Sequence, residues 1–162
     1  MLPRLSSDRF TAEAGYRVMV QVPAPEAAAL RAAILSEDPL QWGDYDQVSH
    51  ETGGVQRFRS LPGGVNAATE AAVEVPCLEL SFFLPDGAAR LERVIRAIYR
   101  AHPYEEPVIQ VVAALRTRHI RGLDEDNPNR FWNRADADWL PDAHRRGVPG
   151  TPQPGTEDTR EA

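Results

Sequence analysis

One short string, residues 102–107 (HPYEEP), holds the residue types best suited to chemistry. Its histidine, His102, offers imidazole nitrogens, and Glu105 and Glu106 offer carboxylate oxygens. Donors of these two kinds bind divalent cations, so the three side chains predict a metal site. The competing interpretation is a rigid connector, because prolines restrict the backbone just after His102 and just before the following strand. In that case an arginine pairs with one of the carboxylates.

A second histidine, His50, is expected on a strand beside Glu51. His50 and His102 could share one metal if this strand folds over the end of the helix that precedes His102, and Asp44 or Asp46 could join them. The alternative is that His50 is a solvated surface residue, and spacing along the chain does not decide between the two. The predicted metal ligands are His50, His102, Glu105 and Glu106.

No catalytic constellation is complete in this sequence. Cys77 lies inside an apolar stretch, where a small buried side chain is a better interpretation than a nucleophile paired with a histidine. The glycine pairs at 53–54 and 63–64 lack the following helix and the fingerprint of a phosphate-binding loop, so they predict turns. We therefore predict no catalytic residues and expect the chain not to be an enzyme.

Composition limits the class of protein. The 162 residues suit one domain, and 42% apolar with 26% charged residues suit a packed core. The net charge of −6 argues against a nucleic-acid partner, because phosphate binding needs a basic face. All 18 basic residues are arginine, which excludes lysine Schiff-base chemistry. The single cysteine, and the lack of a secretory signal or of an apolar stretch near the ~18 residues of a membrane span, predict a soluble cytoplasmic protein.

The elements that must position these residues follow from apolar periodicity. Alternating or short continuous apolar runs predict strands at residues 16–22, 44–52, 55–61, 73–84 and 108–115. Apolar residues at helical spacing predict helices at residues 25–36 and 88–101. The second and third strands, joined by Gly53-Gly54, are expected to form a hairpin, and Pro76 favours an edge or a bulge near the start of the fourth. The last strand is apolar enough to be central and buried on both faces.

This order is β-α-β-β-α-β with an elaborated middle. It predicts the ferredoxin-like α+β class, an antiparallel sheet with two helices on one face. The face without helices is expected to be apolar and to need a cover. A partner subunit commonly supplies such a cover, so the pattern predicts an oligomer.

Composition also divides the chain into four parts. We expect a flexible leader, the ferredoxin-like domain, a docking extension and a disordered tail at residues 1–15, 16–115, 116–141 and 142–162. The extension is charged, with isolated apolar anchors that include Trp132 and Trp139. These anchors could lie in a groove of a neighbouring subunit or cover the open edge of their own subunit.

Several segments match one known pattern: YRVMVQVP at 16–23, the turn at Gly43-Asp44-Tyr45, QRFR at 56–59, VEVPCLELSFFLP at 73–85 and HPYEEP at 102–107. Together they resemble the CutA/PII-like domain inserted in bacterial proteins of the GTP cyclohydrolase type 2 homologue (YqfO-like) family, in its free-standing form. The resemblance covers residues 16–115, and HPYEEP is its most specific part. The extension beyond residue 115 departs from the family pattern.

The resemblance implies a ferredoxin-like fold that packs as a trimer with its sheets edge to edge. It also implies a regulatory or oligomer-organising role rather than catalysis. In PII-type trimers, small ligands and metals lie in clefts between subunits near loops of this kind. On that basis the candidate ligand-binding residues, whose arginines would pair with an anionic ligand, are Asp44, Tyr45, Arg57 and Arg59.

The favoured function is thus a non-enzymatic PII/CutA-like trimer that binds a small effector or a divalent metal in intersubunit clefts and acts on a protein partner. One alternative is a structural assembly module without a small ligand. The other is a metal-dependent hydrolase, which is disfavoured because the catalytic part of the resembled family is a separate domain.

Overall fold

The computed structural model describes residues 3–5, 7–123, 125–134, 139, 141 and 144. The chain divides into two compact units, residues 1–120 and 121–162. The described part of the second unit contains a short 3-10 helix, η2 (Phe131–Asn133). The disordered tail predicted at 142–162 lies outside the described residues, apart from residue 144.

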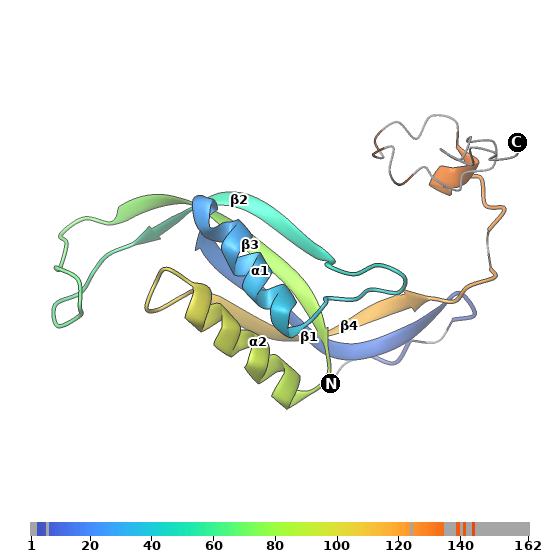
Figure 1. Ribbon diagram of the computed structural model, residues 1–162, viewed down its shortest axis with the longest axis horizontal. Coiled ribbons are helices and arrows are strands. Elements are labelled where there is room, and N and C mark those ends of the chain that lie inside the picture. The colour runs from blue at the N-terminus through green and yellow to red at the C-terminus, as the bar shows by residue number, and fades with distance from the viewer. Residues whose placement is uncertain are drawn as a thin grey trace, which may run out of the picture. The chain divides into compact units, whose positions relative to one another are not determined.

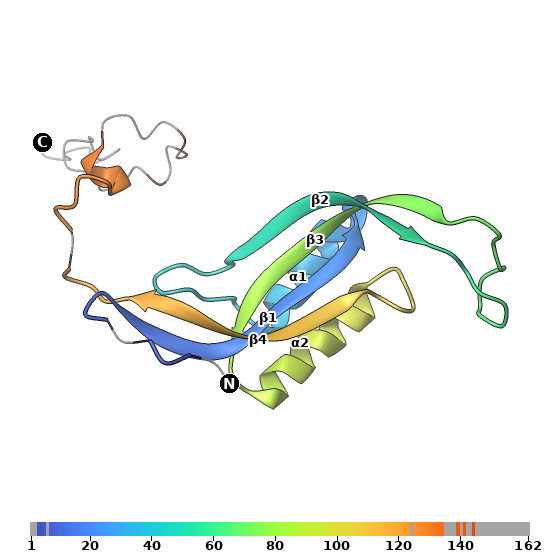
Figure 2. The same ribbon diagram turned by 180° about the vertical axis from the view of Figure 1, so that it is seen from behind.

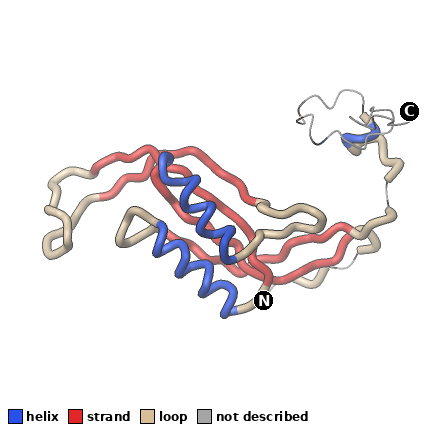
Figure 3. The backbone as a smooth tube through the Cα atoms, viewed as in Figure 1, coloured by secondary structure: helices blue, strands red, loops and turns tan. Residues whose placement is uncertain are grey.

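In the described part of the first unit, four strands and two α-helices follow one another in the predicted order β-α-β-β-α-β (Figure 1). The elements are β1 (Phe10–Pro23), η1 (Ala24–Glu26), α1 (Ala27–Glu37), β2 (Ser49–Phe58), β3 (Val73–Pro85), α2 (Ala88–Ala101) and β4 (Ile109–His119). The sheet has the strand order β2-β3-β1-β4, and all three neighbouring pairs are antiparallel (Figure 3). The predicted ferredoxin-like α+β class is confirmed.

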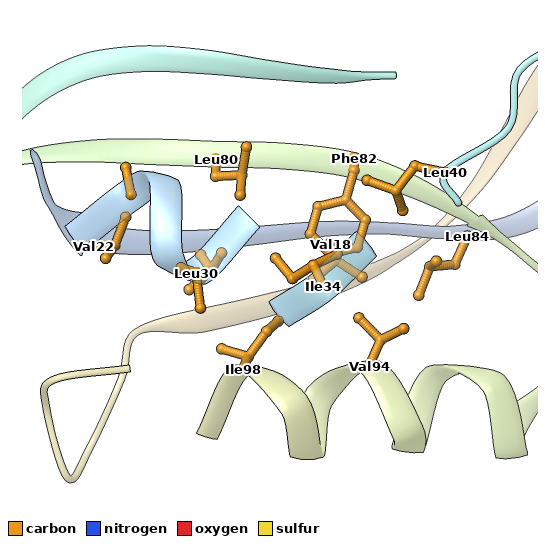
Figure 4. Close-up of a cluster of buried hydrophobic side chains, with 12 residues drawn as sticks. Val18, Val22, Leu30, Ile34, Leu40, Leu80, Phe82, Leu84, Val94 and Ile98 are labelled. Atoms are coloured by element: carbon orange, nitrogen blue, oxygen red, sulfur yellow. The ribbon is translucent and has the colours of Figure 1, made fainter. Parts of the chain in front are cut away.

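The core lies between the sheet and the two helices, which cover the same face (Figures 1 and 4). Alternate residues of β1 and β3 point to the helices, as the period of a strand requires. Each helix adds apolar residues at helical spacing. Fully burying one such side chain stabilises the fold by about 1.5–3 kcal/mol. The buried cluster consists of Val18, Val20, Val22, Ala27, Leu30, Ile34, Leu40, Leu80, Phe82, Leu84, Val94 and Ile98.

The opposite face of the sheet, seen in front of the helices in Figure 2, is mixed in character. The strand register places on this face Arg17, Met19, Gln21, His50, Thr52, Cys77, Glu79, Ser81, Phe83, Gln110 and Val112. More than half of these side chains are polar. The prediction of a broad apolar face that needs a cover is therefore wrong, and any case for an oligomer must rest on another surface.

The predicted hairpin at Gly53-Gly54 is also wrong. Both glycines lie inside β2, where Gly53 pairs with Leu78 and Gly54 with Cys77. Neither has a positive φ, so the backbone stays extended and the two predicted strands are one. The turn comes later, in the loop at residues 59–72. A glycine pair marks a turn only where the surrounding register allows the chain to reverse.

The last strand was expected to be central, but β4 lies at an edge of the sheet and pairs with β1 alone. Val111 is 42% exposed and Val112 50%. A continuous apolar run does not reveal whether it is covered on both sides, and this one is not. By contrast, Pro76 lies where β3 pairs with β2 only, since the pairing with β1 ends at Cys77. Locally this is an edge, as predicted.

Two strands are longer than predicted. β1 begins at Phe10 and β4 ends at His119, and these ends pair with each other as a two-stranded ribbon. Residues expected in the leader and in the extension therefore form strands. The division into leader, domain, extension and tail otherwise stays a prediction. No described helix is long and apolar enough to cross a membrane.

Candidate functional site

His102 follows the last residue of α2 and is only 8% exposed. Its Nε2 lies 2.8 Å from the carbonyl oxygen of Gln21 in β1, and its Nδ1 accepts a hydrogen bond from the backbone N–H of Tyr104 at 3.0 Å. These two contacts fit the tautomer in which Nε2 donates to the Gln21 carbonyl and Nδ1 accepts. Both nitrogens bind the protein's own backbone, so a metal at His102 would have to displace one of these bonds.

The rest of the HPYEEP string packs against β2. The ring of Tyr104 meets His102 at 5.3 Å between centroids and Phe58, the last residue of β2, at 5.9 Å, both edge to face. Glu105 and Glu106 are exposed. The string therefore acts as a connector that ties the end of α2 to β1 and to β2, which is the competing interpretation given above. Among the described residues, no arginine pairs with either carboxylate.

His50 is exposed on β2 and is paired in register with Ser81. Its neighbour Glu51 forms an ion pair with Arg31 of α1. Among the described residues, no three histidine, cysteine, aspartate or glutamate side chains gather closely enough to hold a metal ion. Within one chain the four predicted ligands are not brought together, so the metal site stays a prediction that needs more than one copy.

The predicted anion-binding arginines lie at the far end of β2. Arg57 donates from Nε to Glu74 of β3 at 2.6 Å, a cross-strand ion pair between two exposed side chains. Arg59 is exposed just beyond the strand. Because exposed pairs are weak, typically about 0–1 kcal/mol, Arg57 could exchange Glu74 for a ligand anion at little cost.

Asp44 and Tyr45 lie in the loop between α1 and β2, residues 38–48, which we call the α1–β2 loop. Trp42 and Tyr45 exchange two backbone hydrogen bonds of 2.7 and 3.2 Å across its tip. The Tyr45 side chain is 59% exposed. Two residues without the freedom of glycine, Leu40 and Gln47, have positive φ values of 51° and 56°, a conformation that costs energy and must be held by the surroundings.

The predicted ligand-binding residues therefore fall into two groups at opposite ends of the sheet (Figure 1). Arg57 lies beyond the end of β1, past the level of Pro23. The α1–β2 loop reaches the other end, where Gly15 pairs with Pro85 and Ala114. One chain alone does not form a single site from them.

The sequence did not single out Arg116, the most elaborately bound side chain at this second end. Arg116 is 6% exposed and donates from Nε to Oε2 of Glu13 at 2.8 Å and from Nη1 to the carbonyl oxygen of Gln41 at 2.6 Å. Its guanidinium carbon lies 5.2 Å from the ring centroid of Trp42 and 4.6 Å from that of Phe83. The signal in the sequence that could have found it is the alternation of side chains along a strand, because β4 continues through Arg116 to His119.

One ionisable group near this end is perturbed. The hydrogen bond from the Tyr16 hydroxyl to the Asp86 carboxylate raises the pKa of Tyr16, and the negative charge of Asp86 and partial burial act in the same direction. Each of these favours the neutral phenol. Tyr16 thus remains protonated to higher pH than an ordinary tyrosine.

No protein-family model matches the chain. The "GTP cyclohydrolase 1 type 2 homolog" of Listeria monocytogenes is 28% identical over 113 residues, which cover 66% of this chain and 29% of the relative. The crystal structure of a Bacillus cereus protein related to NIF3 is 27% identical, with a TM-score of 0.54, and the match covers 64% of this chain and 26% of that chain. The resemblance to this family is confirmed.

The matched part is a limited portion of these GTP cyclohydrolase homologues, because the chain spans less than a third of their length. CutA from Synechococcus elongatus is also similar, at 19% identity and a TM-score of 0.46, over 66% of this chain and 82% of that chain. What the whole relatives do is not thereby transferred to this chain.

Proposed function

We propose that this chain is a non-enzymatic binding module that assembles with copies of itself, edge to edge, and binds a small effector or a divalent metal at the junction between copies. The observation that carries the proposal is the outer edge of β4, with which no described strand pairs. From residue 109 to residue 115 this edge contains no charged residue and no proline. Natural sheets usually protect a free edge with one or the other.

The apolar side chains beside this edge support self-association. Val108, Val111 and Val112 are 37%, 42% and 50% exposed. An unprotected edge strand of this kind pairs readily with another strand. The other edge of the sheet is β2. If β4 of one copy pairs with β2 of the next, the same junction repeats from copy to copy. The copies form a closed ring when the rotation between neighbours allows it. The family resemblance suggests a trimer.

Such a junction would bring predicted site residues together. In the sheet register, Glu51 of β2 pairs with Leu80 and Ile109 of β4 pairs with Val20, and Leu80 and Val20 pair with each other. Glu51 and Ile109 therefore lie at the same level on opposite edges of the sheet. In an unshifted junction, the loop that carries Glu105 and Glu106 of one copy would stand beside the end of β2 in the next copy. That segment carries Arg57 and Arg59 and lies a few residues beyond His50.

The assembly is tested by measuring mass in solution by light scattering. Val111→Lys with Val112→Lys places two charges on the edge, while both side chains are exposed enough in a single chain for the fold to tolerate the change. We expect the parent chain to have a mass that is a multiple of 18.0 kDa and the double variant to dissociate. The control is Thr117→Lys, which is exposed further along the same strand. An oligomer that persists in the double variant would exclude β4 as the junction.

The ligand is tested separately by thermal shift over Zn²⁺, Cu²⁺, Mg²⁺ and nucleotides, since a ligand that binds the native state raises its stability. We expect His50→Ala, and Glu105→Gln with Glu106→Gln, to reduce any shift. His119→Ala is the control, because His119 is exposed at the far end of β4. If no compound stabilises the parent chain, the ligand part of the proposal fails.

One observation favours the second candidate, an assembly module without a small ligand. Both ring nitrogens of His102 are bound to backbone groups, so the most specific string of the sequence has a structural task. An oligomer that no ligand stabilises would identify this second function. The cytoplasmic location and the protein partner remain predictions.

A further inference from the structure

We infer that Arg116 is the positioning residue of the α1–β2 loop: it fixes the tip that carries Asp44 and Tyr45 in one place on the sheet. The inference that this tip recognises a ligand rests on the proposed function. The positioning itself does not, because it follows from contacts within one chain.

The Arg116 side chain contacts both β1 and the α1–β2 loop. From β4 it crosses to Glu13 of β1, where Nε donates to Oε2 at 2.8 Å and Nη2 forms an ion pair with the same oxygen at 2.8 Å. It extends further to the carbonyl oxygen of Gln41 in the α1–β2 loop at 2.6 Å. One guanidinium thus joins two strands and the loop. Arginine suits this task because its donors form a rigid planar fork.

The guanidinium lies against an aromatic surface. Trp42 comes from the loop and Phe83 from β3, and their rings meet edge to face with centroids 5.9 Å apart. Arg116 lies over both rings. A cation over an aromatic face is attracted by the ring's negative potential, more so when water is excluded, and Arg116 is only 6% exposed.

Most of the other hydrogen bonds of the α1–β2 loop lie within the loop and do not attach it to the sheet. The backbone N–H of Leu40 donates to Oδ1 of Asp38, and the N–H of Gln47 donates to the carbonyl of Pro39. Trp42 and Tyr45 bond to each other. These bonds join loop residue to loop residue. The buried Leu40 side chain and the cluster around Arg116 hold the loop against the sheet, and Asp38 at the start of the loop pairs with Arg90 of α2.

The consequence is a localised role. Loss of the guanidinium should leave the helices and the central strands intact and release residues 41–47. Hydrogen exchange detects such local opening, because each amide reports the freedom of its own segment. The amides of Trp42, Tyr45 and Gln47 are suitable reporters, because each donates a hydrogen bond within the loop. The positive φ values of Leu40 and Gln47 must be held by the surroundings, so we expect these internal bonds to open more often once Arg116 no longer anchors the loop.

The experiment compares Arg116→Gln with Arg118→Gln in the full chain. Arg118 is two residues further along β4, exposed on the same side of the strand, so its replacement removes the same charge without touching the loop. We expect Arg116→Gln to speed exchange at residues 41–47 by about tenfold or more, with parent rates in α2 and in the middle of β3. Arg118→Gln should have no effect. Arg116→Lys keeps the charge but lacks the planar fork, and should give an intermediate increase.

The inference is overturned if residues 41–47 exchange at the parent rate in Arg116→Gln, if Arg118→Gln has the same effect, or if exchange rises equally throughout the fold. Should Arg116→Gln not fold, Arg116→Lys carries the test with the same readouts. The mass of each variant is measured in parallel. A parent chain that is monomeric but has an Arg116-dependent loop would refute the proposed assembly and leave this inference standing.

Discussion

The ring of Phe83 packs on the backbone of Gly15 so closely that a Cβ atom at position 15 would lie 2.5 Å from Cζ of that ring. The same atom would lie 2.1 Å from the carbonyl oxygen of Leu84. The absent side chain lets the ring lie close against β1. In that position Phe83 offers Arg116 its aromatic surface.

Gly15→Ala is therefore expected to destabilise the fold. The clash with the Leu84 carbonyl involves backbone on both sides, so a change of rotamer does not relieve it, and overpacking of this kind costs about 1–3 kcal/mol. Chemical denaturation measures the loss. Gly54→Ala is the matched control, because a Cβ there meets no atom within 4 Å, and its effect should stay within about 0.5 kcal/mol. Equal stability of the two variants would contradict the close packing.

Ile98→Ala should be among the most destabilising changes in α2. Ile98 is fully buried between the helices and the sheet, and removing such a side chain leaves a cavity that costs about 2–5 kcal/mol. Tyr99, the next residue, is 55% exposed, so Tyr99→Ala should change the free energy of unfolding by about 0.5 kcal/mol or less. Comparable losses in the two variants would mean that α2 packs with a different face.

His102→Ala is expected to loosen the loop between α2 and β4. The change removes the bond to the Gln21 carbonyl and leaves the Tyr104 N–H without its acceptor, at a cost of about 1–3 kcal/mol. His50→Ala serves as the control, since the His50 side chain is exposed on β2. If thermal unfolding without added metal shows no loss for His102→Ala, the structural role assigned to this histidine is wrong.

Tyr16 should titrate above its ordinary range in the folded protein, because the hydrogen bond to Asp86 raises its pKa. A raised pKa means that the neutral phenol is the form favoured by folding. Its contribution is fully present below the unfolded pKa of about 10 and is lost as the pH rises through the folded value. Asp86→Asn should lower the pKa of Tyr16. The pKa of Tyr16 is measured from tyrosinate absorbance, with Tyr16→Phe as the reference. If Tyr16 has the same pKa in the parent chain and in Asp86→Asn, the interaction with Asp86 is refuted.

Much of the fold could be predicted because several elements carry strong periodic signals. The predicted helix at 88–101 coincides with α2, since Leu91, Val94, Ile95 and Ile98 occupy one helical stripe. The position of β4 could not be predicted in the same way. An apolar run such as VIQVVAAL shows that a strand is present but not which strands flank it, and here β1 pairs with it on one side alone.

The candidate site shows the same division. The sequence marks the string at 102–107 as specific, but it does not reveal what His102 contacts. The partner of the His102 ring is Gln21, which lies 81 residues earlier in the chain. Likewise, Arg116 reaches Gln41 from 75 residues away. Local sequence reveals which groups are available, whereas the sheet register decides what each group meets.

The central claim is that the edge of β4 pairs with another copy, and hydrogen exchange along residues 109–115 tests it most directly. In a single chain, no described strand pairs with the amides of β4 that point away from β1, so they should exchange rapidly. We predict that these outward amides are protected in the parent protein and lose protection on dilution and in the Val111→Lys, Val112→Lys variant. Rapid exchange of the outward amides at every concentration would contradict the claim.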